Sequence, residues 1–128
     1  MAFIKVALDA KEPEAAPEGD YDLRITKMED GLKSQKGADM VKVTIRIEGV
    51  DDVQPFNHWI VFPGPKTENV SFAKLQIQRF LEVFNIAHED DGFDTEDLVG
   101  AEGRCMLVQQ EGDDGIIRNA LRLPRLAD

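Results

Sequence analysis

The feature that most constrains the fold is a change of hydrophobic period: short alternating runs flank one segment with helical spacing. The clearest alternation lies at residues 41–48, where apolar side chains occupy every odd position and polar ones every even position: Val41, Lys42, Val43, Thr44, Ile45, Arg46, Ile47 and Glu48. A period of two, rich in β-branched residues, predicts a strand with one buried face.

Four further runs indicate strands, at residues 21–26, 56–62, 104–110 and 116–123. Polar, glycine-containing stretches predict a loop at residues 29–39 and a hairpin turn at residues 111–115. Between the third and fourth strands, residues 70–87 follow the spacing of an amphipathic helix, with Asn69 or Ser71 as its expected N-cap.

The expected order is therefore β-β-β-α-β-β. An OB-fold barrel has five strands with its helix between the third and the fourth, so this mostly β fold is our prediction. An SH3-like barrel and an open α+β sheet stay open as alternatives. We expect residues 20–128 to form a single OB-like domain, preceded by a partly flexible N-terminal segment, residues 1–19.

Within that segment, residues 9–19 are rich in Pro, Glu and Ala, and we expect them to form a flexible lead-in without a packed element. Residues 3–8 are apolar enough to dock as an edge strand or to contact a partner. That partner could be a second copy of the chain, so a homo-oligomer is one of the expected possibilities.

Cysteine content and hydropathy limit the cellular setting. The single cysteine, Cys105, permits no intrachain disulfide and is expected to be a small buried apolar residue. No run approaches the roughly 18 apolar residues of a membrane helix. The first residues also lack the basic and apolar regions of a signal peptide. We therefore expect a cytoplasmic protein without membrane contact, in the host cytoplasm if a phage encodes it.

The net charge of −10 argues against a nucleic-acid ligand when the chain is taken as a whole. The excess is local, however. Residues 9–20 carry five acids and one base, and residues 88–97 carry six acids and no base, which together account for all ten negative charges. The rest of the chain is balanced, so a locally positive face remains compatible with the sequence.

No pattern indicates catalysis, a metal or a cofactor. The two histidines, His58 and His88, have no partner at ligand spacing, and no phosphate-binding glycine loop occurs. Residues 88–97 lack the ligand pattern of an EF-hand, so we expect a solvated acidic loop there. The chain is therefore predicted not to be an enzyme and to use neither metal nor cofactor.

The candidate site follows from strand faces. If the apolar side of each strand faces the core, polar and basic side chains share the outside, with Trp59 opposite the buried side of its strand. OB barrels bind oligonucleotides on the second and third strands and the adjoining loops. The candidate nucleic-acid-binding residues are Arg24, Lys33, Lys36, Lys42, Arg46, Trp59, Arg118 and Arg122. Solubility alone also favours Lys, Arg and Thr on an outer strand face.

Several stretches resemble a family of small phage and prophage proteins. They are residues 19–25, the helix at 72–86 with its Asn-Ile-Ala end, residues 97–100, and Asn119 in the last strand. The family is similar in layout to phage OB-fold proteins that bind single-stranded DNA. The resemblance implies a role near phage replication and recombination proteins, which would then be partners. Many such proteins end in an acidic, aromatic tail, whereas this chain ends Pro-Arg-Leu-Ala-Asp.

Two functions are therefore expected. The first is largely sequence-independent binding of single-stranded DNA in phage or prophage replication or recombination. The alternative is an acidic protein-interaction module, or a nucleic-acid mimic, that binds a basic partner and not DNA.

Overall fold

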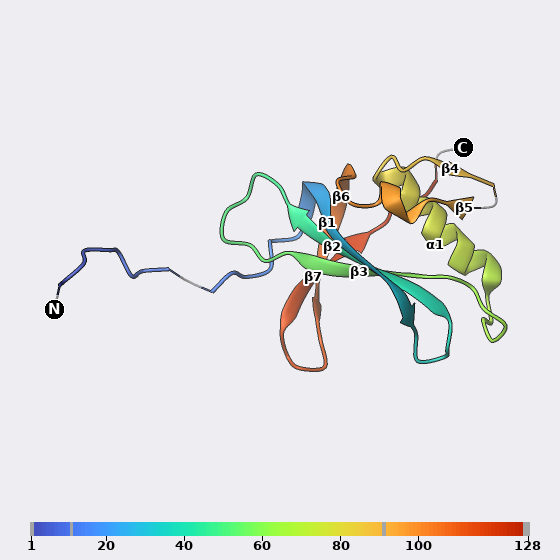
Figure 1. The fold of residues 1–128 in the computed structure, drawn as a ribbon, viewed down its shortest axis with the longest axis horizontal. Helices are drawn as coiled ribbons and strands as arrows, with labels where there is room; N and C mark the ends of the chain where they lie inside the picture. The colour runs from blue at the N-terminus through green and yellow to red at the C-terminus, as the bar shows by residue number, and fades with distance from the viewer. Residues whose placement is uncertain (1, 11, 91, 127–128) are drawn as a thin grey trace.

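In the computed structural model, five antiparallel strands form a sheet that curls into a half-barrel (Figure 1). The structure describes residues 2–10, 12–90 and 92–126. The strands are β1 (Gly19–Lys33), β2 (Asp39–Ile47), β3 (Phe56–Val61), β6 (Glu102–Glu111) and β7 (Ile117–Arg122). Their order across the sheet is β3-β2-β1-β6-β7.

This order is that of an OB-like barrel, and the predicted fold is confirmed. The outer strands β3 and β7 approach each other without backbone pairing, so the barrel is partly open between them. The helix α1 (Val70–Val83) lies between β3 and β6 in the chain, as expected. Asn69 caps it, because its side-chain oxygen accepts a hydrogen bond from the backbone N–H of Phe72 at 3.0 Å.

The strand β1 is longer than its hydrophobic pattern predicts. The loop expected at residues 29–39 is present but covers only residues 34–38, because β1 continues to Lys33 and β2 begins at Asp39. Pairing with β2 holds this polar stretch extended, and an irregularity between Glu29 and Leu32 accommodates Gly31 at φ 73°. A second irregularity, between Ile25 and Lys27, bends β1 where it stops pairing with β6.

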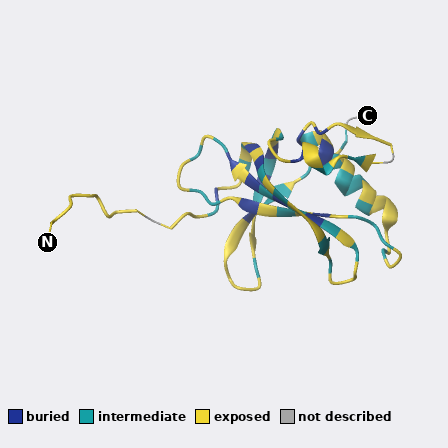
Figure 2. Ribbon diagram, viewed as in Figure 1, coloured by how far each residue is buried: buried dark blue, intermediate teal, exposed yellow. Residues whose placement is uncertain are grey.

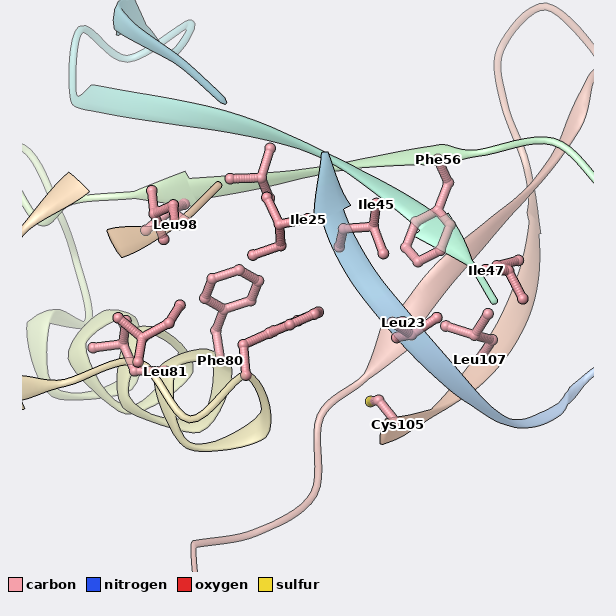
Figure 3. Close-up of a cluster of buried hydrophobic side chains, with 14 of the residues drawn as sticks. Leu23, Ile25, Ile45, Ile47, Phe56, Phe80, Leu81, Leu98, Cys105 and Leu107 are labelled. Carbon is pink, nitrogen blue, oxygen red and sulfur yellow. The ribbon is translucent and has the colours of Figure 1, made fainter. Parts of the chain in front are cut away.

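The core lies between the concave face of the sheet and α1 (Figure 3). From Val41 to Ile47, the odd-numbered side chains of β2 are buried, as their alternation predicts. Phe80 of α1 and Phe84, the residue that caps the end of α1, are fully enclosed and pack on each other at a centroid distance of 4.9 Å. Cys105 is buried among these side chains, as expected.

The helix packs closely against β6 at its C-terminal end. Gly103 of β6 lies under the last turn, where a Cβ atom would come within 2.2 Å of the Val83 carbonyl oxygen. The strand and the helix can approach this closely only because position 103 carries no side chain.

The acidic segment is more ordered than the solvated loop we expected. It contains the two-residue strands β4 (His88–Glu89) and β5 (Gly92–Phe93) and a 3₁₀ turn, Thr95–Asp97. Phe93 stacks on Phe62 with centroids 6.0 Å apart, and Leu98 is fully buried. These apolar side chains hold the segment against the barrel, while the carboxylates among its described residues remain at the surface.

Residues 14–18 also differ from the sequence-based expectation of an unpacked lead-in. Glu14 forms a parallel bridge with Val53, and Ala16 is completely buried. The side chain of Asn119 holds Ala16 by accepting from its N–H at 2.8 Å and donating to its carbonyl at 2.9 Å. Residues 14–18 can therefore pack in an extended form, because Ala16 has a small side chain and Asn119 of β7 satisfies its backbone groups. The described residues before this segment extend away from the barrel (Figure 2).

Candidate nucleic-acid interface

Trp59 lies where the strand alternation places it, on the outer face of β3. Its side chain is 48% exposed, while Phe56 and Ile60 on the opposite side of β3 are buried. The register between β2 and β3 sets Lys42 directly opposite Trp59. An exposed aromatic ring beside a cation is an arrangement that single-stranded nucleic acids can use for stacking and phosphate contact.

The cation beside Trp59 has an acidic neighbour. Lys42 also pairs in register with Glu29 of β1, and its Nζ lies 3.3 Å from the Glu29 carboxylate. The outer face therefore carries the row Glu29, Lys42, Trp59 across three strands. In the next row, the Thr44 hydroxyl donates a hydrogen bond to the Asn57 side chain at 3.0 Å.

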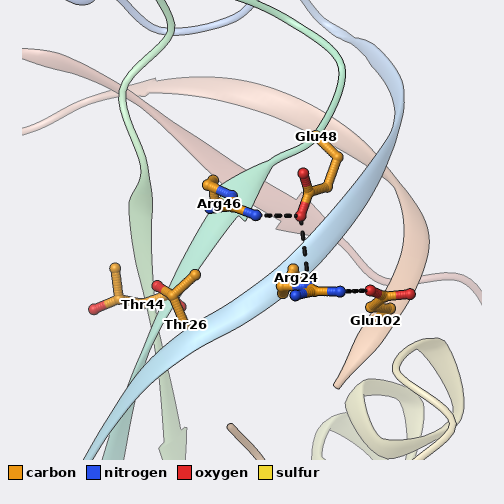
Figure 4. A network of polar contacts seen from close by, with 6 residues as sticks. All are labelled: Arg24, Thr26, Thr44, Arg46, Glu48 and Glu102. Carbon is orange, nitrogen blue, oxygen red and sulfur yellow. Dashed lines mark hydrogen bonds and ion pairs between the residues drawn. The ribbon is translucent and has the colours of Figure 1, made fainter. Parts of the chain in front are cut away.

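Arg24 and Arg46 form a separate ionic network nearer β6 (Figure 4). They lie opposite each other on β1 and β2. Arg46 is 2.8 Å from Glu48, and Arg24 pairs with both Glu48 and Glu102. The hydrogen bond and charge of Glu102 raise the pKa of Arg24. Both guanidinium groups are thus bound by carboxylates, and neither adjoins Trp59 in the strand register.

The hairpin between β1 and β2 carries two candidate cations. Lys33, at the end of β1, forms an ion pair with Asp39 across the hairpin. Lys36 lies in the connecting turn and lines a cavity of about 440 Å³ together with Lys66 and Val61. Lys66 was not among the predicted residues. The sequence feature that could have indicated it is its position in the loop after Pro63-Gly64-Pro65, which ends the third strand.

An open cleft of about 690 Å³ separates β3 from β7, and both Trp59 and Arg118 line it. Arg118 binds Asp114 through two hydrogen bonds, at 2.8 and 3.2 Å. These bonds, together with the Ile116 N–H, lower the pKa of Asp114 to about 2. Asn57 and Gln110 also line the cleft; the sequence argument missed them because it considered cations and aromatic groups alone.

The structure thus groups some of the predicted residues and separates others. Trp59, Lys42 and Arg118 surround one region of surface, and Lys33 and Lys36 extend from the adjoining hairpin. Arg24 and Arg46 belong to the network near β6. Arg122 lies opposite Met106 on β6, four residues along β7 from Arg118, and is not among the lining residues of the cleft.

His58 and Cys105 occupy structural positions. His58 stacks on Phe80 with centroids 4.9 Å apart, and burial lowers its pKa to about 4. Burial also raises the pKa of the Cys105 thiol, so a smaller fraction of it is in the nucleophilic thiolate form. Within residues 2–10, 12–90 and 92–126, no cluster of His, Cys, Asp or Glu side chains is arranged to hold a metal ion. No helix in those ranges has the length and apolar character needed to cross a bilayer.

The chain matches no protein-family model, and no curated protein matches it closely enough to count as a relative. Function is therefore inferred from the fold and from the surface described above.

Proposed function

We propose that this protein binds single-stranded DNA, largely independently of sequence, in phage or prophage DNA replication or recombination. The binding surface is the outer face of β2 and β3, continued by the β1–β2 hairpin and by the cleft beside β7. The observation that carries the proposal is the position of the half-exposed Trp59 beside Lys42 on this face of an OB-like barrel.

The ion pairs on this face define the kind of binding we expect. Lys42, Lys33 and Arg118 each have a carboxylate partner. Exposed ion pairs stabilise a protein by only about 0–1 kcal/mol, so a phosphate can replace each carboxylate at small cost. The displaced carboxylates stay near the bound phosphates and repel them. We therefore expect modest affinity that falls with salt as the phosphate contacts weaken, with a sequence-tolerant contribution of about 1–3 kcal/mol from stacking on Trp59.

The test is a titration of Trp59 fluorescence with a thymine oligonucleotide at low and moderate salt, paralleled by anisotropy of the labelled oligonucleotide. Quenching by the single strand, weaker at higher salt and weaker for a duplex of equal length, is the expected result. Trp59→Ala removes the stacking surface and should weaken binding by about 1–3 kcal/mol in the anisotropy measurement.

Charge variants make the test sharper. Lys42→Glu should weaken binding strongly, whereas Glu29→Gln should tighten it, because the cation is retained and its competing carboxylate is lost. Arg104→Glu is the matched control, since Arg104 is an exposed arginine paired with Asp22 away from Trp59. If Glu29→Gln and Lys42→Glu change affinity no more than Arg104→Glu, the proposed surface is wrong.

A second function, a protein-interaction module for a basic partner, has one observation in its favour. Five of the seven candidate cations are already paired with the protein's own carboxylates. By contrast, no lysine or arginine of the described residues pairs with the described acids of residues 88–97. If the labelled oligonucleotide tumbles freely at high protein concentration while a polylysine probe binds, this second function replaces DNA binding. Lys42→Glu should then leave polylysine binding intact.

A further inference from the structure

Residues 3–8, called the apolar arm below, expose large apolar side chains to an unusual extent. Phe3 is 91% exposed, Ile4 78%, Val6 64% and Leu8 90%. The arm extends away from the barrel (Figures 1 and 2). In a strand, Ile4, Val6 and Leu8 would share one face, because side chains alternate with a period of two. The arm therefore has the pattern of a half-buried strand but lacks a surface to cover it.

The barrel in turn has a strand edge without a partner. The N–H of Phe62 donates to the Asp39 carbonyl of β2 at 2.9 Å. Because backbone groups alternate in direction along a strand, those of Asn57, Trp59 and Val61 point away from β2. On that side β7 approaches β3 without pairing and shares a cleft with Asn57 and Trp59, whereas no β7 residue lines the groove at Trp59 and Val61. In the part of the chain that the structure describes, no strand pairs with β3 there, so the free edge is at Trp59 and Val61. Such an edge is a template for strand addition.

A groove of about 300 Å³ follows this edge between β3 and α1. Val61 on the strand side is 40% exposed, and Phe72 on the helix side is 53% exposed. Ala73, Ile77 and Phe80 continue the helical wall. A strand added to the β3 edge would place one of its faces in this groove, and that face would have to be apolar.

We propose that the apolar arm of one copy of this chain adds as a strand to the β3 edge of a second copy, with Ile4, Val6 and Leu8 in the β3–α1 groove, and that the two copies exchange arms reciprocally. The inference does not depend on DNA binding. It assigns the arm, which the proposed function leaves without a role, and a groove that shares Trp59 with the proposed DNA surface.

The direction of the chain favours a second copy over the arm's own barrel. Glu14 runs parallel to Val53, three residues before β3 begins, so the described residues before Glu14 continue beyond that end of the strand. To reach Trp59 and Val61 of its own β3, the chain would have to reverse its direction between the arm and Glu14. In a second copy no such reversal is needed.

The buried area also favours reciprocal exchange. Covering Ile4, Val6 and Leu8 removes about 300 Å² from water, at about 100 Å² for each aliphatic side chain. With a similar area from the groove, one arm buries about 600 Å² and two arms about 1,200 Å². Specific interfaces bury about 1,200–2,000 Å² in total, so one arm falls short and an exchanged pair reaches the lower end of that range.

The test measures the mass of the full chain by light scattering over a range of protein concentration, without nucleic acid. We expect a concentration-dependent dimer. The arm variant Ile4→Asp/Val6→Asp and the groove variant Phe72→Glu should each be monomeric. Position 72 tolerates glutamate, because it lies three residues after the Asn69 cap, where glutamate favours a helix start. Val99→Asp is the control, since Val99 is equally exposed outside the groove.

Mixing the two variants provides the decisive measurement. One retains an intact groove and the other an intact arm, so an equimolar mixture should form a heterodimer through one arm, more weakly than the parent chain dimerises. A full chain that stays monomeric at every concentration would overturn the proposal, as would a dimer that survives Ile4→Asp/Val6→Asp. DNA binding is scored separately by repeating the oligonucleotide titration on the arm variant.

Discussion

Asn119 is the buried polar residue that holds the segment around Ala16 against the barrel. It is 4% exposed, and its amide satisfies both backbone groups of Ala16, which is itself fully buried. A buried polar side chain is retained at little cost when every group finds a partner. Asn119 thereby converts an otherwise polar, proline-containing segment into a packed part of the domain.

Asn119→Ala should lower the free energy of unfolding by about 2–3 kcal/mol, because it leaves the N–H and C=O of Ala16 buried without their partner. Denaturant unfolding followed by fluorescence measures the change. Asn57→Ala is the matched control: Asn57 is exposed and accepts only from the Thr44 hydroxyl, so a loss below about 0.5 kcal/mol is expected. Equal losses would contradict the anchoring role.

His58 makes stability depend on pH. Its pKa falls from 6.5 to about 4 in the folded protein because of burial, so the unfolded chain binds more protons between these values. Stability should therefore decline as pH falls from about 6.5 to about 4, by up to about 3 kcal/mol, and this contribution should level off below that range.

The measurement compares the pH dependence of unfolding in the parent protein and in His58→Phe. The variant keeps an aromatic ring against Phe80 and cannot be protonated, so it should lose this part of the slope. His88→Gln, which changes an exposed histidine, should retain it. Parallel curves for the parent and His58→Phe would show that His58 is not the group responsible.

At the scale of elements, the contact between β6 and the end of α1 depends on one missing side chain. A Cβ atom at position 103 would lie 2.2 Å from the Val83 carbonyl oxygen and 2.9 Å from its carbon. These are backbone atoms, so they cannot move aside by a change of rotamer. The helix would have to shift away from the sheet and loosen the packing of Phe80 and Phe84.

Gly103→Ala should therefore destabilise the protein by at least about 2 kcal/mol, towards the upper range of overpacking substitutions. Thermal unfolding followed by circular dichroism measures the effect. Gly19→Ala is the control, because its Cβ would meet only the Tyr21 side chain at an ordinary 3.7 Å. Indistinguishable midpoints for the two variants would mean that α1 yields at this contact without cost.

At the scale of the whole molecule, the N-terminal residues divide into two parts with different roles. Residues 14–18 belong to the domain through Ala16, whereas the described residues before them are exposed. Deleting residues 2–9 should leave the unfolding midpoint unchanged at low protein concentration, where the arm has no partner. Deleting residues 2–18 should lower it, because Ala16 and its hydrogen bonds are lost. Equal midpoints for both deletions would contradict this division.

Periodicity determined most of the fold. The alternation at residues 41–48 and around Trp59 predicted which side chains face the core, because a strand exposes successive residues on opposite sides. The order of strands and helix restricted the topology to few choices, of which the OB-like barrel is the one observed. Asn69 was recognisable as a candidate cap from local chemistry alone.

Contacts between residues that are far apart in the sequence could be identified only from the tertiary structure. Residues 29–33 contain polar residues and a glycine that are typical of a loop, yet pairing with β2 makes them a strand. Ala16 is buried because Asn119, more than a hundred residues away, satisfies its backbone. The pairing of Lys42 with Glu29 and of Arg24 with Glu102 depends on strand register, which brings together side chains that the sequence keeps apart. Local patterns therefore specified the elements and their faces, whereas long-range pairing decided which charges meet and which edge stays open.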